Sequence, residues 1–207
     1  DVRVYRQKTA TLIEQLIDDM PLQLPIKQDS LAWIILMGCE HERIHIETSS
    51  VIMRMLDVKY LTQNPIWQPC LSVDKAPENY LVDIASDNVS LGKPGIDSSF
   101  GWDNEYGACD IYVDVFAASK YLVSNQEFIG FVEAGGYQSI EFWTEEGQQW
   151  LKYSKATMPR FWLKKTDEYY QRNLLNEIKL PMNWPVEVNY LEAKAFCNWR
   201  SKIDENN

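Results

Sequence analysis

The 207-residue sequence lacks the features that mark membrane, secreted and nucleic-acid-binding proteins. It has no apolar run near the roughly 18 residues that a membrane-spanning helix needs, and its N-terminal residues lack the basic-then-apolar order of a signal peptide. Acidic residues outnumber basic ones by 30 to 20, and no basic cluster offers a surface to phosphates. We therefore expect a cytoplasmic protein without membrane or nucleic-acid partners.

Cysteine and histidine are also scarce. The four cysteines, Cys39, Cys70, Cys109 and Cys197, lie far apart and form no Cys-x-x-Cys pair. This spacing predicts neither a disulfide framework nor a zinc knuckle, so we expect reduced and mostly buried thiols. Only two histidines occur in the whole chain.

Residues 1–58 have a helical pattern. Apolar side chains between Tyr5 and Met20 recur largely at three- and four-residue steps, which is typical of an amphipathic helix. Two prolines end this pattern, and Asp29 or Ser30 can cap a second helix that runs to about residue 56. Two long helices with a short connection predict a portion of a helical bundle.

The composition changes at residues 59–80, which are rich in Pro, Asn and Gln and have no sustained period, as expected of a linker. Residues 81–207 combine strand-like runs, such as 111–123, with short helices and many aromatic residues. Two helix starts carry capping boxes, formed by Ser124 with Glu127 and by Asn189 with Glu192. The sequence therefore predicts an α+β protein, with a helical-bundle portion followed by a mixed domain.

Both histidines, His41 and His45, lie in the second predicted helix, four residues apart. At about 100° per residue they differ by about 40°, so their rings share one helical face. The same face carries mostly apolar residues, namely Ile34, Met37, Thr48, Ile52 and Met55. We therefore expect both imidazoles to point into the bundle interior, where they would be metal ligands or hydrogen-bonded core histidines.

Two glutamates, Glu42 and Glu47, are close to this pair in the sequence. Glu42 lies near the edge of the histidine face, where it would orient an imidazole or contact a bound water. Glu47 points about 120° or more away, and Arg43 offers it an i,i+4 ion pair, so we interpret Glu47 as structural or as a support for a ligand.

His-Glu-x-x-His is also the signature of zinc metallopeptidases. A metzincin needs a glycine and a third histidine further along the helix, but Thr48 and Val51 stand there. A gluzincin needs a carboxylate ligand on a later helix, but only Glu78 is near, in a linker-like segment. These departures disfavour a peptidase.

Five longer blocks carry a resemblance to a known family. The blocks "CEHERIHIETSS", "FGWDNEYG", "YLVSNQEFIGFVEAGGY", "FWTEEGQQWL" and "LPMNWPVEVNYLEAKAFCNW" resemble the ovothiol-biosynthesis sulfoxide synthases (5-histidylcysteine sulfoxide synthases, OvoA), which are related to the ergothioneine synthases (EgtB). The resemblance extends over essentially the whole chain. It implies the C-terminal part of a DinB-like helical bundle at 1–58, a linker at 59–80 and the N-terminal part of a formylglycine-generating-enzyme-like, C-type-lectin-like domain at 81–207.

The resemblance also implies a reaction. Members of that family hold a non-haem iron(II) ion (Fe2+) with three histidines, two of which map onto His41 and His45. With dioxygen they couple L-cysteine to the imidazole of L-histidine, giving 5-histidylcysteine sulfoxide; the ergothioneine branch uses trimethylhistidine instead. Ile44 is apolar where ergothioneine-branch relatives tend to be polar, which favours the ovothiol branch.

The chain departs from the family because it has no third histidine. In relatives this ligand comes from a helix before the region that matches "VRVYRQK", and the active-site tyrosine lies beyond "CNWRSKIDENN". We therefore expect an internal fragment that, on its own, retains iron weakly or not at all and is inactive. The alternative is a non-catalytic DinB-plus-lectin-like module that binds a partner or ligand.

Other residues have two interpretations. The segment 101–107 either shapes a loop near the iron or forms an Asx-type turn around a buried Trp102. The tryptophans, including Trp143, Trp150, Trp162, Trp184 and Trp199, either stack on a substrate or pack in the domain core, and packing is favoured. The basic residues Arg3, Arg6 and Arg43 are better explained by a solvated helix face than by a substrate carboxylate.

Overall fold

The computed structural model describes residues 1–66 and 70–204, and the chain divides into two compact units. The first unit contains residues 1–49 and 85–115, and the second contains residues 50–84 and 116–207. Each unit is therefore built from segments that are distant in the sequence. The predicted linker at 59–80 contains one turn of 3-10 helix, Val58–Tyr60, at its start, and the predicted domain limits stay a prediction.

Two helices begin the first unit. Helix α1 spans Val2–Asp19 and helix α2 spans Leu31–Met53, as the apolar periodicity predicted. Asp1 caps α1 by accepting a hydrogen bond from the Arg3 backbone N–H at 3.0 Å, and the Ser30 hydroxyl accepts one from the Trp33 N–H at 3.3 Å. The last residues of α2, from Ser50 on, belong to the second unit. Helix α2 is thus the continuous element that passes from one unit to the other.

Two antiparallel ribbons follow. Strand β1 (Leu81–Ile84) pairs with β4 (Phe116–Ser119), and β2 (Asp87–Leu91) pairs with β3 (Cys109–Val113). The strand-like run at 111–123 is therefore confirmed as parts of β3 and β4. Its partners, β1 and β2, gave no comparable signal in the sequence.

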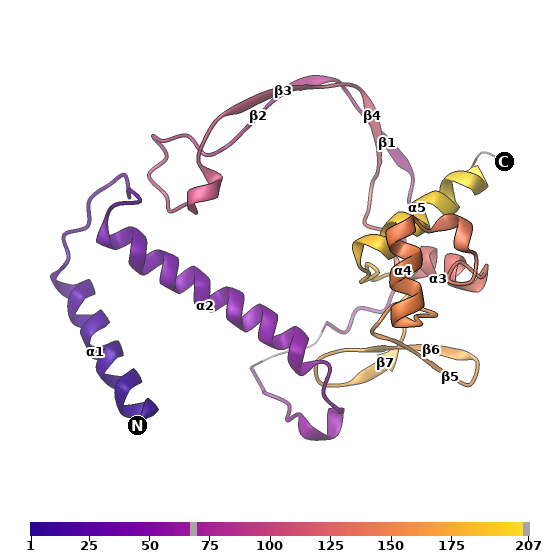
Figure 1. Ribbon diagram of the computed structural model, residues 1–207, viewed down its shortest axis with the longest axis horizontal. Helices are drawn as coiled ribbons and strands as arrows, with labels where there is room; N and C mark the ends of the chain where they lie inside the picture. The colour runs from indigo at the N-terminus through magenta and orange to yellow at the C-terminus, as the bar shows by residue number, and fades with distance from the viewer. Residues whose placement is uncertain (67–69, 205–207) are drawn as a thin grey trace. The chain divides into compact units, whose positions relative to one another are not determined.

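The second unit has an aromatic core. Helices α3 (Asn125–Glu133), α4 (Glu145–Ser154) and α5 (Tyr190–Asp204) cluster in Figure 1. Strands β5 (Trp162–Lys165), β6 (Glu168–Arg172) and β7 (Glu177–Lys179) form an antiparallel sheet in that order. The buried cluster consists of Phe128, Phe131, Tyr137, Trp143, Trp162, Leu180, Ala195 and Phe196. Large aromatic side chains therefore fill most of this core.

The tryptophans of this unit act mainly as packing residues, as favoured from the sequence. Trp143 and Trp162 are buried, and Trp150 and Trp199 pack against the same cluster. Trp184 donates a hydrogen bond from its indole N–H to the Ser72 carbonyl at 2.7 Å. These side chains hold the domain together.

Both predicted capping boxes are present. The Ser124 hydroxyl accepts from the Glu127 N–H at 3.2 Å, and the Glu127 carboxylate accepts from the Ser124 N–H at 2.9 Å. At the start of α5, the Asn189 side chain and the Glu192 carboxylate exchange the same pair of bonds, each at 2.9 Å. Each box satisfies two backbone N–H groups that the first helical turn leaves without partners.

We expect Ser124→Ala to lower the free energy of unfolding by about 1 kcal/mol, because it leaves the first turn of α3 without its side-chain acceptor. Ser124 is also buried, so water does not readily replace the lost acceptor. Urea unfolding measures the loss. The control Ser201→Ala, at an exposed position within α5, should be neutral or slightly stabilising since alanine favours a helix; equal losses in both variants would contradict the capping role.

The cysteine expectation was half wrong. All four cysteines are free thiols, but each lies at an exposed position, not in the core. The aromatic side chains occupy the core volume that the buried thiols were expected to share. In the described part of the chain, no helix combines the length and the apolar character needed to cross a membrane.

Candidate metal centre

His41 and His45 lie one turn apart on α2, and their rings are close together. The ring centroids are 4.5 Å apart and the ring planes make an angle of 86°. Two imidazoles at this spacing present two nitrogen donors on the same helical face, which is how helices commonly supply a pair of metal ligands. The geometry that the sequence predicted for the pair is therefore present, while the ligand role itself stays a prediction.

The expected burial of these rings was wrong. Both histidines are exposed, and so are Ile34, Ile52 and Met55 on the same face. Among the described residues, α1 contributes nothing to the buried set and α2 contributes only Ala32. Periodicity identifies the face that a helix can bury, but burial also needs a covering segment. Burial therefore does not support a metal-binding role for the two imidazoles, and the metal assignment depends on their spacing and on the resemblance.

The residues present fit part of the implied iron site. His41 and His45 are the nitrogen donors that iron(II) accepts, but the resemblance implies three such donors. Within residues 1–66 and 70–204, no group of three or more His, Cys, Asp or Glu side chains gathers as a metal site would require. These two side chains therefore match two of the three expected ligands.

The acidic neighbours of the pair lie on the exposed surface of α2. Arg43 forms its ion pair with Glu40, at 2.6 Å. With 73% of its side chain exposed, Arg43 lies on a solvated helix face, as do Arg3 and Arg6. Glu42 is exposed next to His41, and its predicted part in orienting an imidazole stays a prediction, as does the supporting part of Glu47.

The segment 101–107 forms a turn against the beginning of α2. The Glu105 carboxylate accepts from the Trp102 N–H at 2.6 Å, and the Asp103 carboxylate accepts from the Asn104 N–H at 3.0 Å. Trp33 of α2 donates from its indole N–H to the Gly101 carbonyl at 2.7 Å. The segment therefore forms a turn, but as a single turn of 3-10 helix (Asp103–Glu105) instead of the Asx-type turn expected, and Trp102 is half-buried instead of buried.

A buried pair that sequence reasoning missed joins Tyr137 to α5. The Tyr137 hydroxyl donates to Glu192 Oε1 at 2.6 Å, and both residues are buried. Burial raises the pKa of the Glu192 carboxyl above its ordinary value of 4.5, although the bonds from Tyr137 and from the Asn189 N–H lower it in part. Burial and the neighbouring carboxylate raise the pKa of Tyr137. The capping box pointed to Glu192, but no local signal links it to a tyrosine 55 residues away.

This pair predicts a pH-dependent stability. Between pH 4.5 and the raised pKa of Glu192, the folded protein binds more protons than the unfolded chain, so the free energy of unfolding falls as the pH rises through that window. We expect Glu192→Gln to flatten this fall in urea unfolding measured from pH 4 to 8. Tyr137→Phe removes a bond that lowers the Glu192 pKa, and should cost about 1–3 kcal/mol near neutral pH. Curves that stay parallel to that of the unmodified protein would contradict this assignment.

Comparison with known proteins shows which family the second part of the chain resembles. The family described as the Sulfatase-modifying factor enzyme 1-like domain, FGE-sulfatase, matches residues 73–204. The hercynine oxygenase of Mycobacterium tuberculosis is 30% identical over 110 residues, which are 53% of this chain and 25% of that protein. The hercynine oxygenase of Mycolicibacterium smegmatis is 23% identical over 201 residues, which are 96% of this chain and 44% of that protein.

The chain thus spans between a quarter and somewhat under half of the length of these curated relatives. The family match and the similarity to hercynine oxygenases support the resemblance to the sulfoxide synthases as a group. They do not select the ovothiol branch. The family match does not include α1 and α2, so the DinB-like assignment of these helices stays a prediction. Because the match covers residues 73–204, well over half of the chain, the protein belongs to the FGE-sulfatase family of Sulfatase-modifying factor enzyme 1-like domains.

Proposed function

We propose that the full-length protein is an iron(II)- and dioxygen-dependent sulfoxide synthase that joins a cysteine thiol to the imidazole ring of a histidine-type amino acid. The observation that carries this proposal is the similarity to a hercynine oxygenase over 96% of the chain, which includes the helix with the paired histidines. The family match over 73–204 supports it independently.

The acceptor amino acid has two candidates. The names of the relatives favour hercynine, the trimethylated histidine of the ergothioneine branch. The long blocks around Ser124 and Tyr190, together with Ile44, resemble the ovothiol branch, whose acceptor is histidine itself. The comparisons give the hercynine candidate the stronger support.

In this reaction the chain would supply metal ligands and hold them in place. His41 and His45 would hold iron(II) as neutral imidazoles, with a third donor from elsewhere in the full-length protein. Bound iron would supply the redox chemistry with dioxygen. Glu42 would keep the adjacent His41 ring in one orientation by accepting a hydrogen bond from its distal N–H or from a water between them.

The reaction has a defined balance. A thiol, a ring C–H and one dioxygen give a sulfoxide and one water, so the sulfur gains the ring carbon and one oxygen atom. The thiol proton and the ring proton leave with the second oxygen atom. One dioxygen is therefore consumed for each sulfoxide formed.

The test is an anaerobic iron(II) titration of the full-length protein, followed by addition of cysteine, oxygen and either hercynine or histidine. We expect sulfoxide by mass spectrometry from at least one acceptor, in a 1:1 ratio to oxygen consumed, and no product without iron. An iron-loaded protein that forms no sulfoxide with either acceptor would refute the proposal and favour a binding module without turnover.

A further inference from the structure

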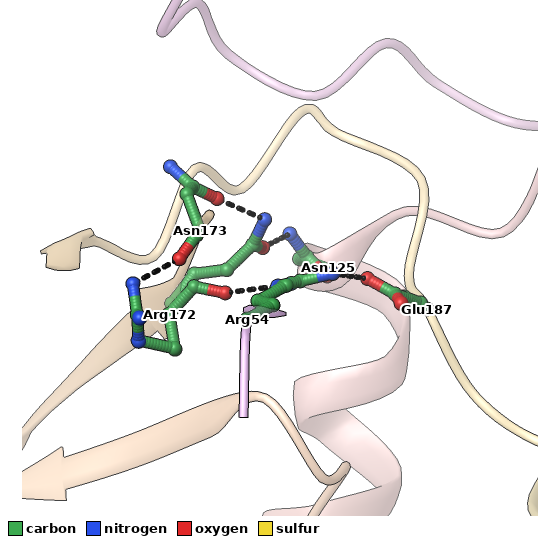
Figure 2. Close-up of polar contacts among 6 residues, drawn as sticks. Arg54, Asn125, Arg172, Asn173 and Glu187 are labelled. Carbon is green, nitrogen blue, oxygen red and sulfur yellow. Dashed lines mark hydrogen bonds and ion pairs between the residues drawn. The ribbon is translucent and has the colours of Figure 1, made fainter. Parts of the chain in front are cut away.

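Two arginines lie together where α2 ends, and Figure 2 shows the hydrogen bond from the Arg54 side chain to Arg172. Arg54 directly follows α2, and its own N–H still donates to the Ser50 carbonyl at 3.0 Å. The Arg54 Nε–H donates to the Arg172 carbonyl at 2.6 Å, and Arg172 Nη2 donates to the Leu56 carbonyl at 3.0 Å. We call Arg54, Leu56 and Arg172 the arginine clasp, because each arginine binds the backbone of the other segment.

Arg54 has two further partners in the FGE-sulfatase domain. Its Nη1 forms an ion pair with Glu187 Oε2 at 2.6 Å, and its guanidinium carbon lies 3.7 Å from the centroid of the Phe161 ring. Only 14% of the Arg54 side chain is exposed. The guanidinium of Arg54 is therefore held by hydrogen bonds, by an opposite charge and by an aromatic ring. A lysine ammonium has no planar group and would not make all of these contacts together.

Arg172 anchors the other side of the clasp. It ends strand β6, is 8% exposed, and its backbone N–H donates to the Phe161 carbonyl at 2.8 Å. Its Nη1 donates to the carbonyls of Asn173 and Leu174 in the loop that follows. The buried guanidinium of Arg172 donates to carbonyls of several backbone segments. These hydrogen bonds keep the segments at fixed distances from one another.

The neighbouring residues connect this anchor to the domain core. Gln171 accepts from the fully buried Asn125 side chain at 3.3 Å and donates to Asn173 at 3.0 Å. Asn125 also donates to the Pro181 carbonyl at 2.8 Å and opens helix α3. The clasp therefore joins the exit of α2 to the start of α3 and to the sheet β5–β6–β7, as Figure 2 shows around Asn125 and Arg172.

We propose that the arginine clasp anchors residues 50–56, at the end of α2, to the sheet β5–β6–β7, and that Arg54 and Arg172 are thereby positioning residues for the helix that carries His41 and His45. His45 precedes Arg54 by nine residues, or about 13.5 Å of helix. A tilt of about 5° at the clasp would move the His45 ring by about 1 Å, and a displacement of that size can reduce a rate by about 100-fold. The catalytic part of this inference rests on the proposed function.

The test compares Arg54→Gln with Arg200→Gln in the full-length protein. Arg200 also forms an ion pair, with Asp204 at 3.1 Å, but 53% of its side chain is exposed and it lies within α5. For Arg54→Gln we expect amide hydrogen exchange in residues 50–56 to accelerate about tenfold, while exchange in α3 stays unchanged. We expect kcat to fall about tenfold or more while KM for cysteine changes less, because the thiol-binding groups remain.

Two milder variants keep the test informative if Arg54→Gln does not fold. Glu187→Gln keeps an acceptor oxygen for Arg54 and removes only the charge, so a smaller change in the same direction is expected. Arg54→Lys keeps the charge without the planar fork and should restore only part of kcat.

Unchanged amide hydrogen exchange in residues 50–56 would contradict the proposal that the clasp anchors the last turn of α2. Faster exchange with an unaltered kcat would overturn its positioning role. If the unmodified protein forms no sulfoxide, the proposed function fails separately, and the exchange measurement alone decides whether the clasp holds α2.

Discussion

Replacing His41 or His45 with alanine in the full-length protein is expected to abolish both iron binding and sulfoxide formation. Each ring would supply one of three nitrogen donors, and loss of a donor from so small a ligand set costs on the order of 3 kcal/mol or more, which weakens binding by a factor of about 100 or more. The two rings lie 4.5 Å apart at exposed positions, so either one is removed without opening a cavity. Anaerobic iron(II) titration with a colorimetric chelator measures the loss directly.

The control for this prediction is Glu40→Ala. Glu40 precedes His41 on α2, and its ion pair with the exposed Arg43 is worth at most about 0.5 kcal/mol. We expect this variant to bind iron as the unmodified protein does. If His41→Ala or His45→Ala still formed product at the unmodified rate, the ligand assignment would be wrong, while a loss of activity with retained iron would assign the ring to substrate contact.

Local sequence rules predicted the elements that depend on neighbouring residues. The apolar steps between Tyr5 and Met20 predicted α1, and the Ser124–Glu127 pair predicted the start of α3, because both signals lie within one or two helical turns. Strand pairing depends on distant segments. Leu81 pairs with Ser119 and Trp162 pairs with Gln171, and neither strand's own pattern contains information about its partner.

The same distinction separates what was predicted at the candidate site from what was not. The i,i+4 spacing predicted that the rings of His41 and His45 would be close together, since helix geometry alone determines it. Their burial was predicted wrongly, because it depends on a segment that covers the face. The contact of Arg54 with Arg172 spans 118 residues, so it was not foreseeable from local sequence.

A large loss of stability is expected when the close contact between Gly136 and Phe131 is disturbed. A Cβ atom added to Gly136 would lie within 3.0 Å of three Phe131 ring atoms, closer than real Cβ atoms approach any atom. Gly136 has little freedom to retreat. Its N–H donates to the Phe131 carbonyl at 2.9 Å, and its carbonyl accepts from the Trp143 indole N–H at 2.8 Å. We therefore expect Gly136→Ala to cost about 3 kcal/mol, at the upper end of the range for overpacking.

Phe131→Ala should cost about 3–5 kcal/mol alone, because the ring is completely buried in the aromatic cluster. The double variant should lose at least about 1 kcal/mol less than the sum of the two single losses, since the new methyl group enters the space that the ring vacates. Gly95→Ala is the control, because nothing lies within 4 Å of a Cβ at that position, and it should change stability by less than about 0.5 kcal/mol.

Urea unfolding followed by tryptophan fluorescence measures the free energies of unfolding for this double-mutant cycle of Gly136 and Phe131. Trp143 and Trp199 both contact the Phe131 ring, with centroid distances of 6.3 and 5.6 Å, so their emission reports on this core. Strictly additive losses would mean that the two positions do not share one packed volume. Because the core contains none of the candidate metal ligands, a variant of the full-length protein that remains folded at low temperature should still bind iron, which separates loss of stability from loss of the metal centre.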